Sequence, residues 1–227
     1  MPDPSSPSLG LAVAHLFWKP GPLAEREAVA EAVHSVASET DQVIVAAMLG
    51  HKADLATMML SSDQWRIRRF QTTMTEAGME LVDSYLSFTE LSEYNPDPPE
   101  ELRSARLYPR LPPEGKPAFC FYPMSKRRNV EQNWFSLEFD RRKELMYEHG
   151  MSGRRFSGRV LQVVTGSTGV DDHEWGVTLF CEHPDDVKEV VYTLRFDEAS
   201  AVYAEFGTFY VGMVADIDSA LDEIGVR

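Results

Sequence analysis

The stretch FYPMSKRR brings three chemically different side chains together. Tyr122, Met124 and Lys126 follow one another at intervals of two residues, so a β-strand would present them on one face. That row offers a phenol, a thioether and an ammonium group to one ligand. Lys126 also begins a run of cations with Arg127 and Arg128, in a chain whose formal net charge is −14. Such a run is either a solvated basic loop or part of an anion-binding site.

A second polar set follows an apolar run near the C-terminus. Arg195 lies in LRFDEASAVY, Ser200 follows five residues later, and the aromatic EFGTFY comes next. We expect this arginine and serine at strand ends, where with a lysine from another strand they can hold several carboxylates. Together the two sets indicate a large ligand, flat or apolar, that carries carboxylate groups.

The sequence contains six histidines, and His149 in YEHGMSGRR is predicted to end an amphipathic helix. Leu145 and Met146, four and three residues earlier, form the apolar stripe of that helix, so the imidazole should point along the buried face and need a partner. A ligand role is one interpretation. A structural role is the other. A histidine in the last turn interacts favourably with the helix dipole, and Gly150 would end the helix as the C′ residue.

Other clusters lack the spacing of known sites. His173 and His183 lie beside acidic residues and are interpreted as solvated turns rather than zinc ligands. The glycine-rich turn GSTG does not open a helix, which argues against a phosphate loop. The sequence also contains no nucleophile elbow and no nucleotide fingerprint.

The composition is that of a globular protein. The 227 residues are 43% hydrophobic and 26% charged, enough for a sizeable core. No apolar run approaches the roughly 20 residues of a membrane helix, and MPDPSSPSLG lacks the regions of a secretory signal, so we expect a cytoplasmic protein. The acidic balance argues against nucleic acid as a partner. Cys120 and Cys181 lie in strand-like runs and are predicted to be buried, reduced thiols.

The elements that must position these residues occur twice in the same order. The first unit comprises expected strands over residues 9–18, 42–50, 55–60 and 80–91 and helices over 24–38 and after Asp63. The second comprises the strand CFYPMS, a helix from Trp134 to His149, strands near 157–166 and 174–181, a helix from Asp185 and the strand EFGTFYVGMV. A short closing helix, IDSALDEIG, follows.

This repeat predicts an α+β fold of two βαββαβ halves. The N-terminal half comprises residues 1–95 and the C-terminal half residues 117–227. A proline-rich connector, residues 96–116, joins them. The two sheets would either pack face to face or close into a barrel.

Four spaced motifs carry a resemblance to a known family. FYPMSKRR…NW, MYEHGMSGR, VLQVVTGSTGVDDHEWGVTLF and VVYTLRFDEASAVYAEFGTFYVG resemble coproheme decarboxylases, the haem-synthesising relatives of chlorite dismutases, in the form found in Firmicutes and similar bacteria. The resemblance is strongest over residues 104–213; the first half matches in topology and in phrases such as TELSEY. It implies a dimeric α+β barrel of two ferredoxin-like halves, assembled as a homopentamer, with the porphyrin in the C-terminal half.

The resemblance also implies roles for individual residues. Tyr122 matches the catalytic radical tyrosine, His149 the axial haem iron ligand, and Gln162 a residue on the distal side. The matches to residues that contact the substrate propionates are Arg106, Met124, Lys126, Arg195 and Ser200. One departure is Phe135, which follows Asn133 and Trp134 where the family commonly has tyrosine; it bears on a local hydrogen bond or a secondary radical site.

The implied substrate is iron coproporphyrin III (coproheme), which carries four propionates and is also the redox cofactor. The implied reaction uses hydrogen peroxide and a tyrosyl radical at Tyr122, which takes hydrogen from a propionate β-carbon. Carbon dioxide leaves, and two rounds give haem b through a three-propionate intermediate. The resemblance further implies transient contact with a ferrochelatase. The composition, as argued above, predicts no nucleic-acid or membrane partner.

Two alternatives share this fold. Chlorite dismutation uses a distal arginine in the chlorite-degrading branch, whereas the matching residue here is the neutral Gln162. A non-catalytic haem-binding protein is the second alternative, and Tyr122 argues against it because a carrier gains nothing from an oxidisable phenol beside a propionate.

Overall fold

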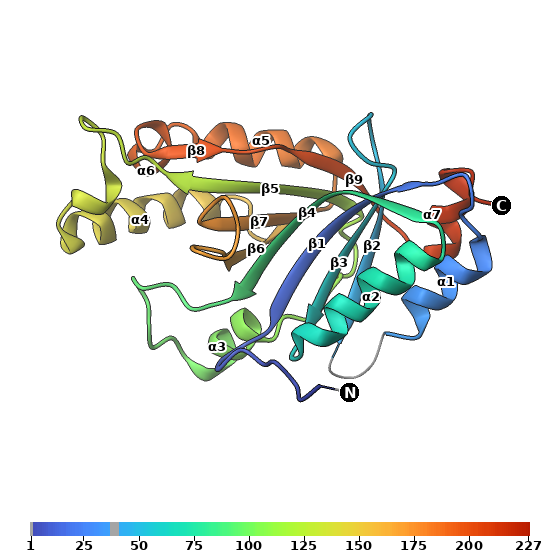
Figure 1. The fold of residues 1–227 in the computed structure, drawn as a ribbon. Helices are drawn as coiled ribbons and strands as arrows, with labels where there is room; N and C mark the ends of the chain where they lie inside the picture. Colours follow the sequence, from blue (N-terminus) through green and yellow to red (C-terminus); the bar gives the residue numbers. More distant parts are fainter. Residues whose placement is uncertain (1, 37–40) are drawn as a thin grey trace.

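The computed structural model describes residues 2–36 and 41–227. Over these residues the chain forms one large antiparallel sheet, whose strand order differs from the sequence order, covered by helices (Figure 1). The strands are β1 (Ala12–Pro20), β2 (Gln42–Met48), β3 (Leu55–Ser61), β4 (Met79–Thr89), β5 (Ala118–Lys126), β6 (Val160–Gly166), β7 (Trp175–Cys181), β8 (Ala204–Phe206) and β9 (Tyr210–Val214). The helices are α1 (Arg26–His34), α2 (Gln64–Glu76), α3 (Glu100–Leu107), the 3₁₀ turn η1 (Trp134–Ser136), α4 (Phe139–Arg154), α5 (Pro184–Leu194), α6 (Glu198–Ala201) and α7 (Ile217–Glu223).

The strand order shows two copies of one motif. The N-terminal half pairs as β4-β1-β3-β2 and the C-terminal half as β9-β5-β7-β6. Both orders are the fourth, first, third and second strand of a βαββαβ unit. Strand β4 pairs with β6 and β2 pairs with β9, so the two sheets close into one barrel. The predicted α+β barrel of two ferredoxin-like halves is confirmed.

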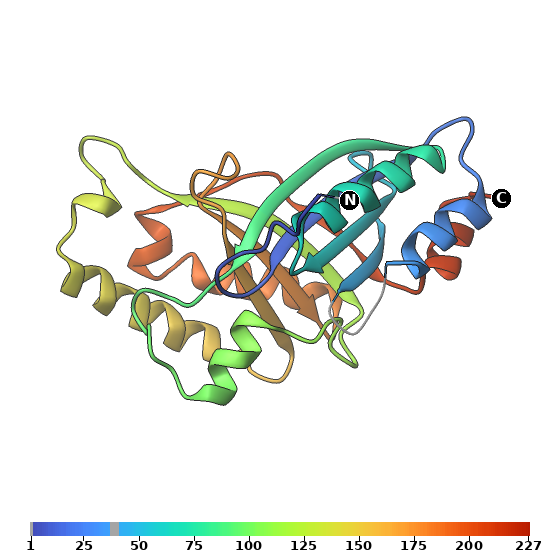
Figure 2. The same ribbon diagram turned by 60° about the horizontal axis from the view of Figure 1, so that its bottom comes forward.

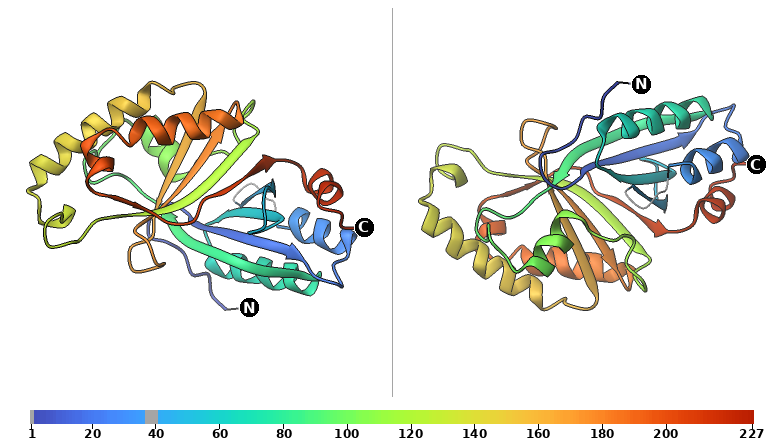
Figure 3. Two further views of the ribbon diagram at one scale, coloured as in Figure 1. Left: turned by 90° about the horizontal axis from the view of Figure 1, so that it is seen from above. Right: turned by 90° about the horizontal axis from the view of Figure 1, so that it is seen from below.

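Alternating side chains divide each strand between two cores. Inside the barrel, apolar residues of both halves meet, with Phe17 from β1 and Phe121 from β5 among them. On the outer face of the N-terminal sheet, a second core packs against α1, α2 and α7. The outer face of the C-terminal sheet lies beneath α4 and α5 (Figures 2 and 3).

Several boundaries differ from the predicted ones. Helix α4 continues through His149 and Gly150 to Arg154, so the prediction that Gly150 stops this helix is wrong. The predicted helix over 24–38 is observed as α1, and its residues 37 and 38 lie outside the described residues. The connector contains an unpredicted helix, α3, which follows Pro99, and the final strand is split into β8 and β9.

The expected strand-end placement of Arg195 and Ser200 is also wrong. Arg195 caps the C-terminus of α5 and Ser200 lies in the short helix α6. The physical reason is the spacing of Val187, Val190 and Leu194, which are buried at helical intervals rather than in alternation.

Cys120 and Cys181 are buried free thiols, as predicted. Within the described part of the chain, no helix has the length and apolar character needed to cross a membrane.

Candidate functional site

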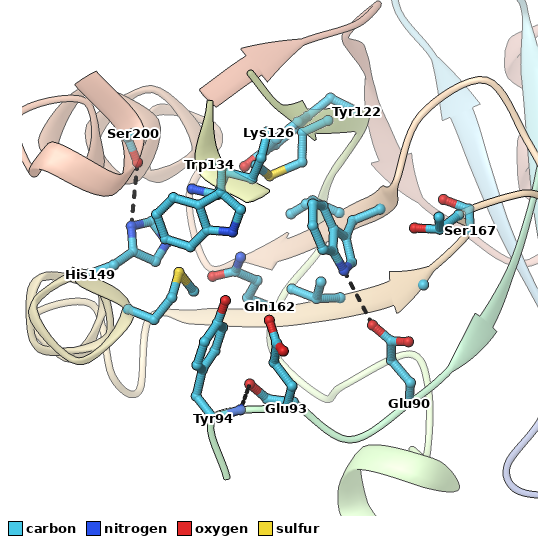
Figure 4. Close-up of a pocket in the computed structure, with 18 of the residues that line it drawn as sticks. Glu90, Glu93, Tyr94, Tyr122, Lys126, Trp134, His149, Gln162, Ser167 and Ser200 are labelled. Atoms are coloured by element: carbon cyan, nitrogen blue, oxygen red, sulfur yellow. Dashed lines mark hydrogen bonds between the residues drawn. The ribbon is translucent and has the colours of Figure 1, made fainter. Parts of the chain in front are cut away.

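A cavity of about 530 Å³ lies against the outer face of the C-terminal sheet (Figure 4). Its size is that of a site for a small molecule or cofactor. Strands β5, β6 and β7 supply one wall, and α4 with residues from the 88–94 segment supplies others. Seven of the eight predicted site residues line it, namely Arg106, Tyr122, Met124, Lys126, His149, Gln162 and Ser200.

Tyr122 is a buried phenol on the β5 wall. Its ring stacks on Phe209 with centroids 4.5 Å apart and meets the edge of Phe206 at 5.6 Å. Burial raises the pKa of Tyr122, so the group stays protonated at neutral pH. No described residue hydrogen-bonds its hydroxyl, which lies at the cavity wall. The phenol is held by its ring alone, and its hydroxyl is available to a ligand.

Lys126 continues the same strand face as a buried cation. Its Nζ donates a hydrogen bond to the Ala199 carbonyl at 2.5 Å and lies 4.5 Å from the centroid of the Trp134 ring. Burial lowers the pKa of Lys126 to about 8, although the charges of Asp197 and Glu174 oppose this shift. A ligand carboxylate would find an ammonium here whose protein partners are only a carbonyl and an aromatic ring.

His149 projects from the interior of α4, and its ring nitrogens have different environments. Nδ1 lies 3.0 Å from Oδ2 of Asp197 and 3.3 Å from Oγ of Ser200. Burial opposes ionisation of Asp197, but the hydrogen bonds and charge of His149 and the Ser200 contacts outweigh it and lower the pKa of Asp197. Among the described residues, Nε2 of His149 has no hydrogen-bond partner. An imidazole oriented by a carboxylate at one nitrogen and free at the other is the arrangement of a metal ligand.

Asp197 was not predicted from the sequence. It caps α6, where its Oδ1 accepts a hydrogen bond from the Ser200 backbone N–H at 3.0 Å. An aspartate just before EASA is an N-cap signal, but that signal does not reveal a contact with His149, 48 residues away in sequence.

The segment from Glu90 to Tyr94 forms an acidic side of the cavity that the sequence analysis also missed. Trp175 Nε1 donates a hydrogen bond to Glu90 at 3.2 Å, and Arg142 lies 3.6 Å from a Glu93 carboxylate oxygen. Arg142 Nε also donates to the Tyr94 hydroxyl at 3.3 Å, which ties this segment to α4. These residues belong to the phrase TELSEY, which the sequence analysis used only as part of the family resemblance. That resemblance was the signal that could have pointed to this side of the cavity.

The two predicted arginines lie differently. Arg106 lines the cavity from α3, with its side chain exposed. Arg195 is outside the lining residues; its guanidinium carbon lies 5.6 Å from the centroid of Phe206, whose ring does line the cavity. Gln162 reaches the cavity from β6 and is labelled in Figure 4.

These residues fit an iron porphyrin. The wall combines apolar and aromatic surface with one free imidazole nitrogen, a partnerless phenol and two cations. A flat apolar ring with a metal centre and carboxylate arms matches that set of donors and surfaces.

Comparisons with known proteins agree with this assignment. Residues 25–215 match the family described as chlorite dismutase. A coproheme decarboxylase from Staphylococcus carnosus is 42% identical over 177 residues, covering 73% of this chain and 70% of that protein. A putative heme-binding protein from Natronomonas pharaonis is 38% identical over 219 residues, covering 86% of this chain but only 36% of that longer protein.

Solved structures share the whole fold. A heme-binding protein from Thermus thermophilus superposes with a TM-score of 0.85 at 34% identity and covers 99% of both chains. A chlorite dismutase from Candidatus Nitrospira defluvii, in complex with imidazole, has a TM-score of 0.76 over 96% of both chains at 18% identity, a likeness of fold. By its family match, its sequence relatives and its barrel, this chain belongs to the chlorite dismutase family, as a relative of the coproheme decarboxylases.

Proposed function

We propose that the protein is a coproheme decarboxylase, an oxidoreductase that converts iron coproporphyrin III to haem b with hydrogen peroxide. The observation that carries the proposal is the shared cavity of Tyr122, Lys126 and His149, in which an oxidisable phenol lies beside a carboxylate-binding cation and a free imidazole nitrogen. The relationship to a coproheme decarboxylase at 42% identity supports the same reaction.

His149 would hold the iron through Nε2. Asp197 accepts the hydrogen bond of Nδ1 and so keeps the proton on that nitrogen, which leaves Nε2 as the lone-pair donor. The bound iron porphyrin supplies the one-electron redox chemistry that amino-acid side chains lack. The protein contributes orientation, charge and the phenol.

Lys126 and Arg106 would bind propionates, with the Ser200 hydroxyl and the Met124 thioether completing the contacts. Lys126 can exchange its Ala199 carbonyl for a carboxylate, a stronger, charge-assisted partner. Arg195 would act indirectly, through its contact with the Phe206 ring and through its charge, which partly offsets the effect of burial on the pKa of Tyr122.

Tyr122 would be the radical residue. Losing an electron and its proton, it becomes a neutral phenoxyl that takes a hydrogen atom from the propionate β-carbon. Loss of one further electron releases carbon dioxide and leaves a vinyl group. One hydrogen peroxide accepts the two electrons of each decarboxylation and is reduced to water. Two rounds pass through a three-propionate intermediate.

A haem-binding protein without decarboxylase activity is the second candidate, favoured by the names of the Thermus and Natronomonas relatives. Chlorite dismutation ranks below it, because the polar residue supplied by β6 is the neutral Gln162.

The deciding experiment is an anaerobic titration of the coproheme-loaded protein with hydrogen peroxide, with products resolved by mass. We expect stepwise loss of two carboxyl groups in the wild type and none in Tyr122→Phe. Tyr85→Phe is the matched control, because Tyr85 is also a buried tyrosine but hydrogen-bonds Ser167. Porphyrin that only bleaches supports the haem-binding candidate, and consumption of added chlorite with intact porphyrin supports the dismutase.

We extend the proposal to the assembly and its setting. A homopentamer, a cytoplasmic location and transient contact with a ferrochelatase follow from the resemblance alone. Light scattering of the purified protein tests the first, since any mass other than five chains contradicts it.

A further inference from the structure

A second tyrosine, Tyr210, lies on the strand next to that of Tyr122 and on the other face of the barrel wall. Strands β5 and β9 are paired so that Phe121 lies opposite Tyr210, and they run side by side in Figure 1. Phe209, the residue before Tyr210, stacks on the Tyr122 ring at 4.5 Å. Because successive side chains alternate across a strand, Tyr122 faces the cavity and Tyr210 faces the barrel interior.

The two hydroxyl groups have opposite environments. The Tyr122 hydroxyl has no partner among the described residues. The buried Tyr210 hydroxyl donates to the carboxylate of Asp83, whose side chain is exposed at the surface of β4. A phenol loses an electron far more readily when a base takes its proton at the same time. Tyr210 has that base, and Asp83 can pass the proton to solvent.

The surroundings of Tyr210 favour coupled loss of electron and proton. The ammonium of Lys52 lies 5.7 Å from the Tyr210 ring centroid, and a nearby cation disfavours a positively charged ring radical. Transfer of the proton to Asp83 leaves a neutral phenoxyl instead. The ring also stacks on Phe17 with centroids 3.7 Å apart, which shields a radical from solvent and from the reacting ligand.

We propose that Tyr210, with Asp83 as its proton acceptor, is a second redox-active tyrosine that takes over the oxidising equivalent of Tyr122 when no propionate reacts. One electron moves from Tyr210 to the Tyr122 phenoxyl. The Tyr210 proton moves to Asp83, and Tyr122 takes a proton from solvent and is a phenol again. The inference rests on one part of the proposed function, the oxidation of Tyr122, and not on the decarboxylation itself.

Such a site would protect the porphyrin. A radical stranded on Tyr122 lies at the wall of the ligand cavity and can attack the ligand that it is meant to convert. Moving the equivalent through the wall, toward the exposed carboxylate of Asp83, separates it from the porphyrin. The predicted signature is therefore a radical on Tyr210 and less damage at the cavity.

The test adds hydrogen peroxide to protein loaded either with coproheme or with haem b, in the presence of a nitroso spin trap. Trapped residues are mapped by peptide mass, and the tyrosyl radical is followed by freeze-quench electron paramagnetic resonance. We expect an adduct on Tyr210 in the wild type and its loss in Tyr210→Phe. Asp83→Asn should lower the Tyr210 adduct several-fold and raise both the Tyr122 adduct and porphyrin bleaching. Tyr85→Phe, a change elsewhere in the same core, should leave the Tyr210 adduct in place.

The outcomes separate this inference from the proposed function. Wild-type adducts confined to Tyr122 or to exposed tyrosines such as Tyr192, or an Asp83→Asn variant indistinguishable from the wild type, would overturn the inference even if coproheme is decarboxylated. A Tyr210 adduct that depends on Tyr122 and Asp83, in protein that does not decarboxylate coproheme, would uphold the inference and overturn the function. A Tyr210 adduct that persists in Tyr122→Phe contradicts the route through Tyr122.

Discussion

The two halves of the barrel share one strand order and differ in how their first helix meets the sheet. Helix α1 of the N-terminal half buries four of its nine residues, Val29, Ala30, Ala32 and Val33. Helix α4, its counterpart, buries only Leu145 of sixteen residues. The sheet beneath α1 is closed by side chains, whereas the sheet beneath α4 faces the cavity.

The first strands show the same difference residue by residue. The outer face of β1 carries Ala12, Ala14, Leu16 and Trp18, all buried in the N-terminal core. The outer face of β5 carries the following residues in the same order: Ala118, Cys120, Tyr122 and Met124. Side chains that fill space in one half are replaced by side chains with chemistry in the other. One topology thus supplies a half closed by its core and a half that carries the cavity, which we name the stabilising half and, by its proposed role, the binding half. A fold alone does not set a function.

The largest loss of stability should come from removing a large side chain from the core of the N-terminal half. Phe70, on α2, is 1% exposed, so Phe70→Ala should lower the free energy of unfolding by about 3–5 kcal/mol through lost burial and a cavity. Met146→Ala, in the wall of the existing cavity, should cost about 1 kcal/mol or less. Urea denaturation measures both. Equal costs would contradict the division into a stabilising and a binding half.

A matched pair of histidines tests the binding half. His149→Ala on α4 should remove iron–imidazole coordination and lower decarboxylation by more than about 100-fold, beyond the usual cost of losing an outer-shell partner. His34→Ala is the control, because His34 is an exposed residue on the counterpart helix α1. The absorption spectrum of the ferric protein reports the coordination. A His149→Ala variant that keeps the wild-type spectrum would remove His149 as axial ligand, while residual porphyrin binding is expected from Lys126 and Arg106.

Much of this site could be predicted from the sequence because strand geometry is regular. Alternation placed Tyr122, Met124 and Lys126 on one face, and all three line the cavity. The end of α4 could not be predicted, because Gly150 is a local stop signal and the helix continues past it to Arg154. A glycine inside a helix costs only about 1 kcal/mol relative to alanine, so it is a weak stop signal.

Long-range partners were also beyond the sequence. Lys126 donates a hydrogen bond to the carbonyl of Ala199, the residue before Ser200 in α6. Nothing in the spacing of these residues along the sequence predicts that bond. The helix predicted from Asp185 contains the apolar run before Arg195, and it is observed as α5. The expectation of a strand end at Arg195 was inconsistent with that helix, because Val187, Val190 and Leu194 recur at helical spacing.

The contact between the halves should make stability depend on pH. His15 of β1 is buried and hydrogen-bonded through Nε2 to Thr178 of β7 at 2.8 Å. Burial lowers the pKa of His15 to about 3, below the value of about 6.5 in an unfolded chain. Between these values only the unfolded state binds the proton. Stability is therefore fully present above about pH 6.5 and falls as the pH drops, by about 1.4 kcal/mol per unit.

His15→Gln should flatten that slope, and His34→Gln should not, since His34 is exposed. Carboxylates with lowered pKa values, such as those of Asp63 and Asp197, also lose their contribution in acid, so the difference between variants is the informative quantity. Urea titrations between about pH 6 and 4.5 measure it. Parallel curves for wild type and His15→Gln would show that this histidine is not the acid-sensitive contact.

The smallest predicted effect concerns the ammonium in the cavity wall. Because burial lowers the pKa of Lys126 to about 8, this cation is present below that pH and is lost above it. Affinity for metal-free coproporphyrin III, which cannot use His149 as a metal ligand, should therefore be full below pH 8 and about tenfold weaker one unit above it. Lys126→Arg should keep its charge and flatten the profile, whereas Lys52→Arg, an exposed lysine beside Tyr210, should not. A wild-type profile that stays flat through pH 9 would mean that Lys126 binds no propionate, and Arg106 would then be the main cation of the binding half.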